Sequence, residues 1–228
     1  MITPKAYVEE IRKALSVYSN KERSKDQKAY MRDQFEFLGL TATQRRTAQK
    51  PLLKKGELPN FDDIPDLIRE LWKQPEREFQ YFGQELLAKY KRKLSPEDLL
   101  LLEFMITYKS WWDTVDFIAS HLVGSLFASF PAMRVSSCDK WFESQNIWLQ
   151  RTSLLFQLKY KEQLDTELLS IQIDRLAQSE EFFIRKAIGW TLREYSKTNP
   201  DWVLEFVDQR PGLSNLSRRE ALRLMQAV

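Results

Sequence analysis

Cysteine and histidine are almost absent from this 228-residue chain, which contains one of each, Cys138 and His121. A single cysteine cannot form an intrachain disulfide, which predicts a reducing, cytoplasmic environment. One Cys and one His cannot supply the ligands of a Cys/His zinc site, so we expect no metal. His121 lies in the apolar stretch FIASHLVGSLF, which predicts a packed helical residue. If the chain is an enzyme, its carboxylates, aromatic side chains and basic residues must carry the chemistry.

Other features are also scarce. Six glycines and nine prolines are few for a chain of this length and favour long helices over hairpins. No apolar run approaches the roughly 18 residues of a membrane span, and the beginning of the chain, MITPKAYVEEIRKAL, lacks the apolar core of a signal peptide. Neither GxGxxG nor a P-loop occurs, so we expect no nucleotide cofactor and no cofactor of another kind. These absences predict a globular helical protein without a membrane segment.

The charges are distributed unevenly. The net charge is +3, but residues 1–55 contain 13 Lys/Arg and 6 Asp/Glu, a balance of +7, and the remainder sums to −4. A basic N-terminal quarter is a candidate binding surface for a polyanion. A solvated helical face with surplus lysine explains the same counts, so charge alone leaves both interpretations open.

Helical periodicity extends over almost the whole chain, and no segment alternates as a strand does. The expected order begins with a helix over 4–18, a helix over 28–40, a short helix from about Thr43, a loop over 51–60 and a helix over 61–75. Gly39 would end the second of these helices, and Pro75 the last. The sequence therefore predicts an all-α fold.

Three later segments resemble one another, REFQYFGQELLAKYK, IWLQRTSLLFQLKYK and FFIRKAIGWTLREYSK. Their tyrosines Tyr90, Tyr160 and Tyr195 are separated by 70 and 35 residues, so a period of 35 fits if WWDTVDFIASHLVGSLF is a diverged copy. Such a period is typical of an α-solenoid of paired helices that binds along its concave side. Chance similarity between amphipathic helices is the alternative. We expect one domain over 1–228, with basic helices over 1–60 and repeats over 61–228.

The most unusual stretch is KSWWDTVD, Lys109–Asp116. Ser110 is a candidate N-cap, with Asp113 as the acidic residue of the first turn. Trp112 and Asp116 are four residues apart and share a helical face. An aromatic plane beside a carboxylate suits a flat cation, or a cation that forms in a transition state. Core packing of both tryptophans is the structural alternative.

The period also relates three charged residues, which are Asp116, Arg151 and Lys186. Stacked repeats would place them in a row on one surface. Lys186, Trp190 and Arg193 share a helical face at spacings of four and three. In a groove lined by these side chains and Lys159, neighbouring cations would lower the pKa of Asp116. Tryptophans, a carboxylate and several cations in one groove fit a DNA-binding cleft with a chemical centre.

Six stretches in one order carry a family resemblance, and they are Tyr30–Gly39, Arg69–Gln80, Lys109–Asp116, Asn146–Lys161, Glu181–Pro200 and Leu216–Ala221. With them the chain, from about Ala29 to Ala221, resembles the AlkD-like DNA alkylation repair family, the HEAT-like-repeat alkylpurine DNA glycosylases. The resemblance implies HEAT-like repeats and a catalytic site. It assigns catalytic roles to Asp116, Trp112 and Trp190, and DNA contacts to Tyr30, Arg151, Lys159 and Arg193. The period, which places Lys186 in one row with Asp116 and Arg151, adds Lys186 as an expected DNA contact.

The resemblance also implies a reaction. The family hydrolyses the N-glycosidic bond of cationic N3- and N7-alkylated purines, such as 3-methyladenine and 7-methylguanine, in duplex DNA and leaves an abasic site. Asp116 would stabilise the oxocarbenium-like state or position a water, and the damaged base would have little contact with protein. We expect a monomer whose partner is damaged double-stranded DNA. A Schiff base on Lys186 is an alternative mechanism, and a non-catalytic scaffold that binds DNA or protein is the alternative function.

Overall fold

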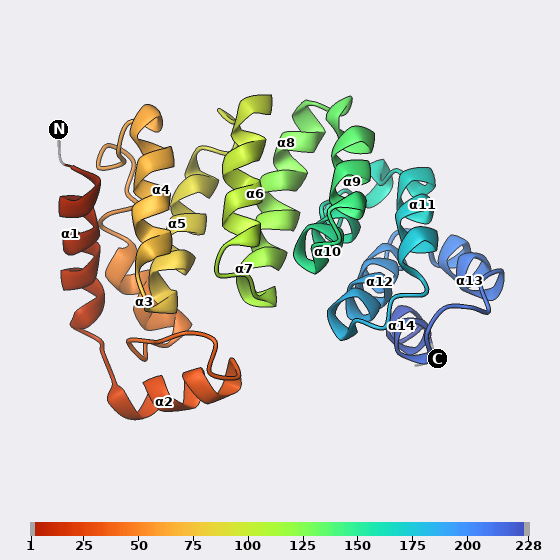
Figure 1. The fold of residues 1–228 in the computed structure, drawn as a ribbon, viewed down its shortest axis with the longest axis horizontal. Helices are drawn as coiled ribbons and strands as arrows, with labels where there is room; N and C mark the ends of the chain where they lie inside the picture. Colours follow the sequence, from red (N-terminus) through yellow and green to blue (C-terminus); the bar gives the residue numbers. More distant parts are fainter. Residues whose placement is uncertain (1–2, 226–228) are drawn as a thin grey trace. The chain divides into compact units, whose positions relative to one another are not determined.

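The computed structural model describes residues 3–225, which form helices joined by loops (Figure 1). These residues contain no β-strand, and a single isolated bridge pairs Glu36 with Glu76. The predicted all-α, solenoid-type fold of paired helices is therefore confirmed. The described residues also contain no helix long and apolar enough to cross a membrane. The chain falls into two compact units, Met1–Lys93 and Leu94–Val228, and each is described by itself. The single domain over 1–228 stays a prediction.

The first unit consists of α1 (Pro4–Ser16), α2 (Lys21–Tyr30), α3 (Ala42–Gln49), η1 (Phe61–Asp63), α4 (Ile64–Lys73) and α5 (Arg77–Lys89). Thr3 caps α1, since its side chain accepts a hydrogen bond from the backbone N–H of Ala6 at 3.3 Å. The apolar stripe of α1 is buried, and α1 packs against α3 and α4. The positions of α1, α3 and α4 agree with the sequence expectation.

The expected helix over 28–40 is wrong. The polar stretch before it forms α2 instead, because Asn20 caps the helix by accepting from the N–H of Arg23 at 2.9 Å. After α2 the chain is irregular, and Phe35 and Phe37 are buried while Glu36 between them is exposed. Gly39 adopts a φ of +88° inside this loop. It serves a left-handed turn there, which glycine adopts at little cost, and does not end a helix.

Helix α2 has no buried residue, so apolar packing does not hold it. Polar contacts connect it to the loop that follows: the hydroxyl of Ser24 donates to the carbonyl of Phe37 at 2.6 Å, and the amide of Gln27 donates to the carbonyl of Leu40 at 2.8 Å. The position of this basic helix therefore depends on the position of the loop over 37–40.

Glu78, a buried residue of α5, fixes that loop. Its carboxylate accepts hydrogen bonds from the backbone N–H groups of Leu38, Gly39 and Leu40 at 3.0 to 3.3 Å. Three donors that converge on one carboxylate satisfy backbone groups that no helix pairs. Glu78 belongs to a motif that the sequence offered only as part of the family resemblance.

Glu78→Gln should lower the free energy of unfolding by about 2–3 kcal/mol, because the new NH₂ group faces backbone donors and leaves them unpaired. Denaturant unfolding would measure the loss. Glu10→Gln, the same change at an exposed position of the same unit, should change the free energy by less than about 0.5 kcal/mol. Equal effects in the two variants would show that Glu78 does not anchor the loop.

The second unit consists of η2 (Pro96–Asp98), α6 (Leu99–Thr107), α7 (Trp112–Phe117), the π-helix η3 (Ile118–Val123), α8 (Gly124–Ser129), α9 (Met133–Glu143), α10 (Ile147–Leu155), η4 (Lys161–Gln163), α11 (Thr166–Leu176), α12 (Phe182–Tyr195), α13 (Pro200–Asp208) and α14 (Asn215–Ala221). One row of helices packs in succession, since α10 contacts α7 and η3, α12 contacts α10, and α14 contacts α12. The candidate site lies on this row.

The helix starts follow the period of the sequence repeats. Helices α5, α7, α10 and α12 begin at Arg77, Trp112, Ile147 and Phe182, each 35 residues after the one before. Ion pairs in the second unit join residues at almost the same separation, 36 between Asp139 and Arg175 and again between Asp174 and Arg210. A fixed repeat length places equivalent residues of neighbouring helix pairs side by side, as a solenoid requires.

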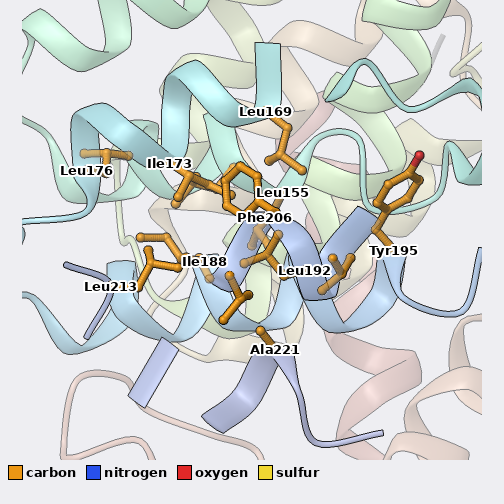
Figure 2. Packing of buried hydrophobic residues seen from close by; sticks show 14 of the residues in the cluster. Leu155, Leu169, Ile173, Leu176, Ile188, Leu192, Tyr195, Phe206, Leu213 and Ala221 are labelled. Atoms are coloured by element: carbon orange, nitrogen blue, oxygen red, sulfur yellow. The ribbon is translucent and has the colours of Figure 1, made fainter. Parts of the chain in front are cut away.

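An apolar cluster fixes the second half of this unit. Figure 2 shows side chains from α10 to α14 around one core, among them Leu155, Ile173, Leu192 and Phe206. These four are at most 4% exposed. Because α12 contributes to this core along one side, its other side is held rigidly for the charged residues described next.

Candidate active site

The stretch that the sequence singled out forms the start of α7. The predicted N-cap is wrong: Trp111, with extended backbone, is the N-cap residue, and Ser110 lies outside the helix. The ring of Trp111 packs on those of Trp148 and Phe183, at centroid distances of 5.7 and 5.1 Å. This packing fixes the entry of the chain into α7, so the first helical residue is Trp112. Asp113 lies in the first turn, where the helix dipole favours a carboxylate.

Asp116 forms a bidentate ion pair with Arg151 of α10. The Nε of Arg151 donates to Oδ1 of Asp116 at 2.7 Å, and Nη2 donates to Oδ2 at 2.8 Å. Arg151 also donates through Nη1 to the carbonyl of Phe183 at the start of α12. Its side chain is 5% exposed and that of Asp116 is 15% exposed. The guanidinium thus joins α7, α10 and α12 and fixes the direction of the carboxylate.

The pKa of Asp116 departs from the expectation. Burial raises the pKa of this carboxyl above its ordinary value, while the hydrogen bonds and charge of Arg151 oppose the rise. The sequence analysis predicted a lowered pKa, because the spacing indicated cations near Asp116 but gave no sign that the carboxyl is buried. Since Arg151 is the group that favours the charged form, the ionisation of Asp116 depends on it.

The helix widens directly after Asp116. Residues Ile118–Val123 form the π-helix η3, and the hydroxyl of Ser120 donates to the carbonyl of Asp116 at 2.7 Å. The ring of His121 stacks on that of Phe117 at a centroid distance of 4.2 Å. Sequence reasoning missed this π-helix, and its apolar letters carry no signal for it. Such segments are frequent at functional sites.

His121 is half-buried and engages the exposed Lys159, a predicted DNA contact. Nζ of Lys159 lies 2.8 Å from Nε2 of His121, and Nδ1 lies 3.2 Å from the carbonyl of Phe117. An ammonium can only donate, so this arrangement assigns the imidazole proton to Nδ1. The expected helical packing of His121 is observed, together with a polar contact that the sequence did not predict.

Lys186 and Arg193 of α12 share one partner. Nζ of Lys186 lies 2.9 Å from Oε1 of Glu220, and Nη1 of Arg193 donates to Oε2 of the same carboxylate. The hydrogen bond from Lys186, followed by the charges of Lys186 and Arg193, lowers the pKa of Glu220 against the effect of burial. The sequence analysis missed Glu220. A further step of 35 from Lys186 reaches position 221, next to it, and would have indicated it.

Gly189 allows α14 to approach α12 closely. A Cβ atom there would lie 2.5 Å from the Cβ of Glu220 and 2.8 Å from the carbonyl oxygen of Ser217. The hydroxyl of Ser217 donates to the carbonyl of Arg185 at 2.9 Å and closes the same contact. Glycine at 189 is therefore the condition for the carboxylate of Glu220 to reach both cations.

Gly189→Ala should lower the free energy of unfolding by about 1–3 kcal/mol, because the added methyl group overpacks the contact between the two helices. Calorimetric melting would detect the loss. Gly212→Ala is the matched control, since the nearest atom to a Cβ there, in Gln178, is 3.4 Å away, an ordinary contact. Melting temperatures that fall equally in both variants would contradict the close approach at Gly189.

The remaining predicted residues occupy different places. Trp112 and Trp190 are both partly exposed, and Trp190 packs against the apolar cluster of Figure 2 while it lies between Lys186 and Arg193 on α12. Tyr30 ends α2 in the first unit and is 72% exposed. The structure pairs Asp116 with Arg151 and Lys159 with His121. It also places Lys186 and Arg193 in contact with the carboxylate of Glu220. The roles predicted for all these residues stay predictions.

Comparison with known proteins identifies the family. The sequence profile described as DNA alkylation repair enzyme matches residues 11–225. The chain belongs to this family. Among solved structures, a predicted DNA alkylation repair enzyme from Enterococcus faecalis is 33% identical, with a TM-score of 0.84 over 92% of this chain and 98% of that one. No curated protein sequence matches the chain.

Membership in the DNA alkylation repair enzyme family gives the site a context. Its chemistry concerns alkylated DNA, so DNA is the substrate, and the resemblance drawn from the sequence motifs is confirmed. In the part of the chain that the structure describes, no group of three or more His, Cys, Asp or Glu side chains is placed to hold a metal ion. In this DNA alkylation repair enzyme, Asp116 is a largely buried carboxylate that Arg151 holds through both of its oxygens.

Proposed function

We propose that this DNA alkylation repair enzyme is a monofunctional glycosylase. It hydrolyses the N-glycosidic bond of cationic N3- and N7-alkylated purines in duplex DNA and leaves an abasic site. The observation that carries the proposal is the Asp116 carboxylate, largely buried and held by both oxygens on Arg151 in a member of a DNA alkylation repair family. A buried, oriented carboxylate is costly for a fold, which favours a catalytic use of it.

The chemistry of the substrate fits a site built on a carboxylate. An alkylated purine carries positive charge and is already a good leaving group, so no strong general acid is needed. As the bond to the base breaks, positive charge develops on the deoxyribose. Asp116 stabilises that charge, and it also accepts hydrogen bonds from the attacking water. The interaction strengthens as the charge develops, so it lowers the barrier and does not merely bind the substrate.

Arg151 has a positioning role in this proposal. Its Nε, Nη1 and Nη2 all donate inside the protein, to Asp116 and to the carbonyl of Phe183. The guanidinium favours the ionised form of the carboxylate and fixes its direction, so that no reorganisation is needed during the reaction. The phosphate contact first expected of Arg151 is less compatible with this burial than the contacts expected of Lys159, Lys186 and Arg193.

The damaged nucleotide is held mainly through its backbone and sugar. Trp112 and Trp190 are partly exposed aromatic surfaces that can contact the deoxyribose or the cationic base, worth roughly 0.5–2 kcal/mol each. Lys159, Lys186 and Arg193 bind phosphates, which orients the duplex without reading its sequence. A labile cationic base leaves without a deep protein pocket around it, in contrast to enzymes that enclose an extruded base.

Base release from a defined duplex tests the proposal. The chain is incubated with DNA that contains one 7-methylguanine, and free base and abasic sites are followed over time, with protein-free DNA as the reference. Release well above the spontaneous rate is expected, and 3-methyladenine DNA should give the same result. If neither base is released, the glycosylase proposal is overturned and a non-catalytic DNA-binding scaffold remains. Borohydride trapping of an enzyme–DNA adduct that Lys186→Ala abolishes would replace hydrolysis by the Schiff-base mechanism.

A further inference from the structure

Two of the cations expected to bind phosphate are already paired. Lys186 and Arg193 each contact one oxygen of Glu220, the first at 2.9 Å. The three side chains are exposed to different degrees, 35% for Lys186, 22% for Arg193 and 12% for Glu220. The carboxylate therefore lies on the inner side of the pair, and solvent reaches the two cations from outside.

The arrangement depends on close packing of two helices and not on flexible side chains that meet by chance. Gly189 and Ser217 bring α14 against α12. Glu220 then projects between Lys186, one turn before Gly189, and Arg193, one turn after it. Lys186 and Arg193 are seven residues apart, two helical turns, so one carboxylate spans both ends of the face that carries Trp190. The carboxylate is thus fixed beside the surface on which DNA is expected.

A carboxylate offers these cations what a phosphate offers, an anion with oxygens that accept hydrogen bonds. Glu220 stays charged at neutral pH, because Lys186 lowers its pKa. Together the three groups carry a net charge of +1, where the two cations alone would carry +2. A phosphate that arrives from the solvent side gains less attraction than two free cations would give, since Glu220 repels it.

We propose that Glu220 is a built-in competitor for the DNA phosphate at Lys186 and Arg193, and that it limits the affinity of the protein for undamaged DNA. This inference rests on the DNA binding in the proposed function, but not on base release. Weak binding to undamaged duplex shortens the time spent at sites without a lesion. At a lesion, the contacts of the tryptophans add to the affinity.

The test compares affinities for undamaged duplex DNA by fluorescence anisotropy over a range of salt concentrations. Glu220→Gln should bind about three- to tenfold tighter, and its plot of log K against log salt should be steeper by up to about one unit. Glu205→Gln is the matched control, because it makes the same charge change on α13, where Glu205 accepts from Gln209 and not from a cation. Glu205→Gln should stay within about twofold of the wild type. The proposal is overturned if Glu220→Gln binds undamaged duplex as tightly as the wild type does, or more weakly. It is also overturned if Glu220→Gln gains no more affinity than Glu205→Gln.

A second comparison keeps the test decisive if Glu220→Gln folds poorly. Lys159 contacts the imidazole ring of His121, whereas Lys186 contacts a carboxylate. Lys159→Met should therefore lower the affinity for undamaged duplex more than Lys186→Met does, by about threefold or more. Equal losses, or a larger loss in Lys186→Met, overturn the competition by Glu220. The 7-methylguanine assay is separate from both comparisons, so a chain that releases no base leaves the affinity results valid.

Discussion

Asp116→Asn should slow base release under single-turnover conditions by about a hundredfold or more. The asparagine keeps the shape of the side chain and one oxygen for Arg151, but it carries no charge to stabilise an oxocarbenium-like state. It also binds an attacking water more weakly. Affinity for duplex DNA should stay within about threefold, because phosphate contacts dominate that affinity and Asp116 makes none.

The measurement is release of 7-methylguanine from a defined duplex with enzyme in excess, together with DNA binding by the same preparation. Asp113→Asn is the matched control: the same substitution in the same helix, one turn earlier, at a residue whose charge raises the pKa of Asp116 only as the last of several causes. It should change the rate by less than about threefold. Release by Asp116→Asn at the wild-type rate would exclude a catalytic carboxylate at this position.

Arg151→Met should have the second largest effect, on stability and on pH dependence together. Removal of the guanidinium leaves the Asp116 carboxylate buried without its partner, and the free energy of unfolding should fall by about 3–5 kcal/mol. The pKa of Asp116, already raised by burial, should rise further without the group that opposes the shift. In the proposed mechanism only the ionised carboxylate is active, so activity on the acid side should be lost at a higher pH than in the wild type.

Denaturant unfolding and a pH profile of the single-turnover rate measure the two effects. Arg175→Met removes a comparable ion pair, with Asp139, that is far more exposed, and should cost less than about 1 kcal/mol. If Arg151→Met is too unstable to assay, Arg151→Lys keeps the charge with fewer donors and should shift the profile in the same direction by less. An acid limb that stays at the wild-type pH would contradict the dependence of Asp116 on Arg151.

The double variant Asp116→Asn/Arg151→Met separates a buried-charge effect from general disruption. With both charges gone, no uncompensated ion remains, so part of the stability lost in Arg151→Met should return. Losses that simply add would mean that the two side chains act independently, in conflict with their two hydrogen bonds.

Much of this architecture was predictable from the sequence because the repeat length is local information. A helix, a turn and a second helix of fixed lengths produce a period of 35, and the helix starts follow it. The period then placed Asp116 and Arg151 at equivalent positions, and the structure joins them. Prediction failed where local signals conflicted. The polar stretch before Tyr30 lacks an apolar face, so α2 was not predicted, and a helix was expected instead over the apolar residues that follow it.

The sequence by itself determined the all-α class, the repeat and the residue types of the site. Only the tertiary structure decided which charges are buried and which partner each one takes. Arg151 forms a buried ion pair with Asp116, and Glu220 forms ion pairs with Lys186 and Arg193. The helix that follows Asp116 continues as the π-helix η3. These outcomes depend on how closely neighbouring helices approach, as at Gly189, where α12 and α14 meet. Periodicity indicates which face of a helix meets its neighbour, but the distance between them, and hence the burial that sets each pKa, is a property of the packed structure.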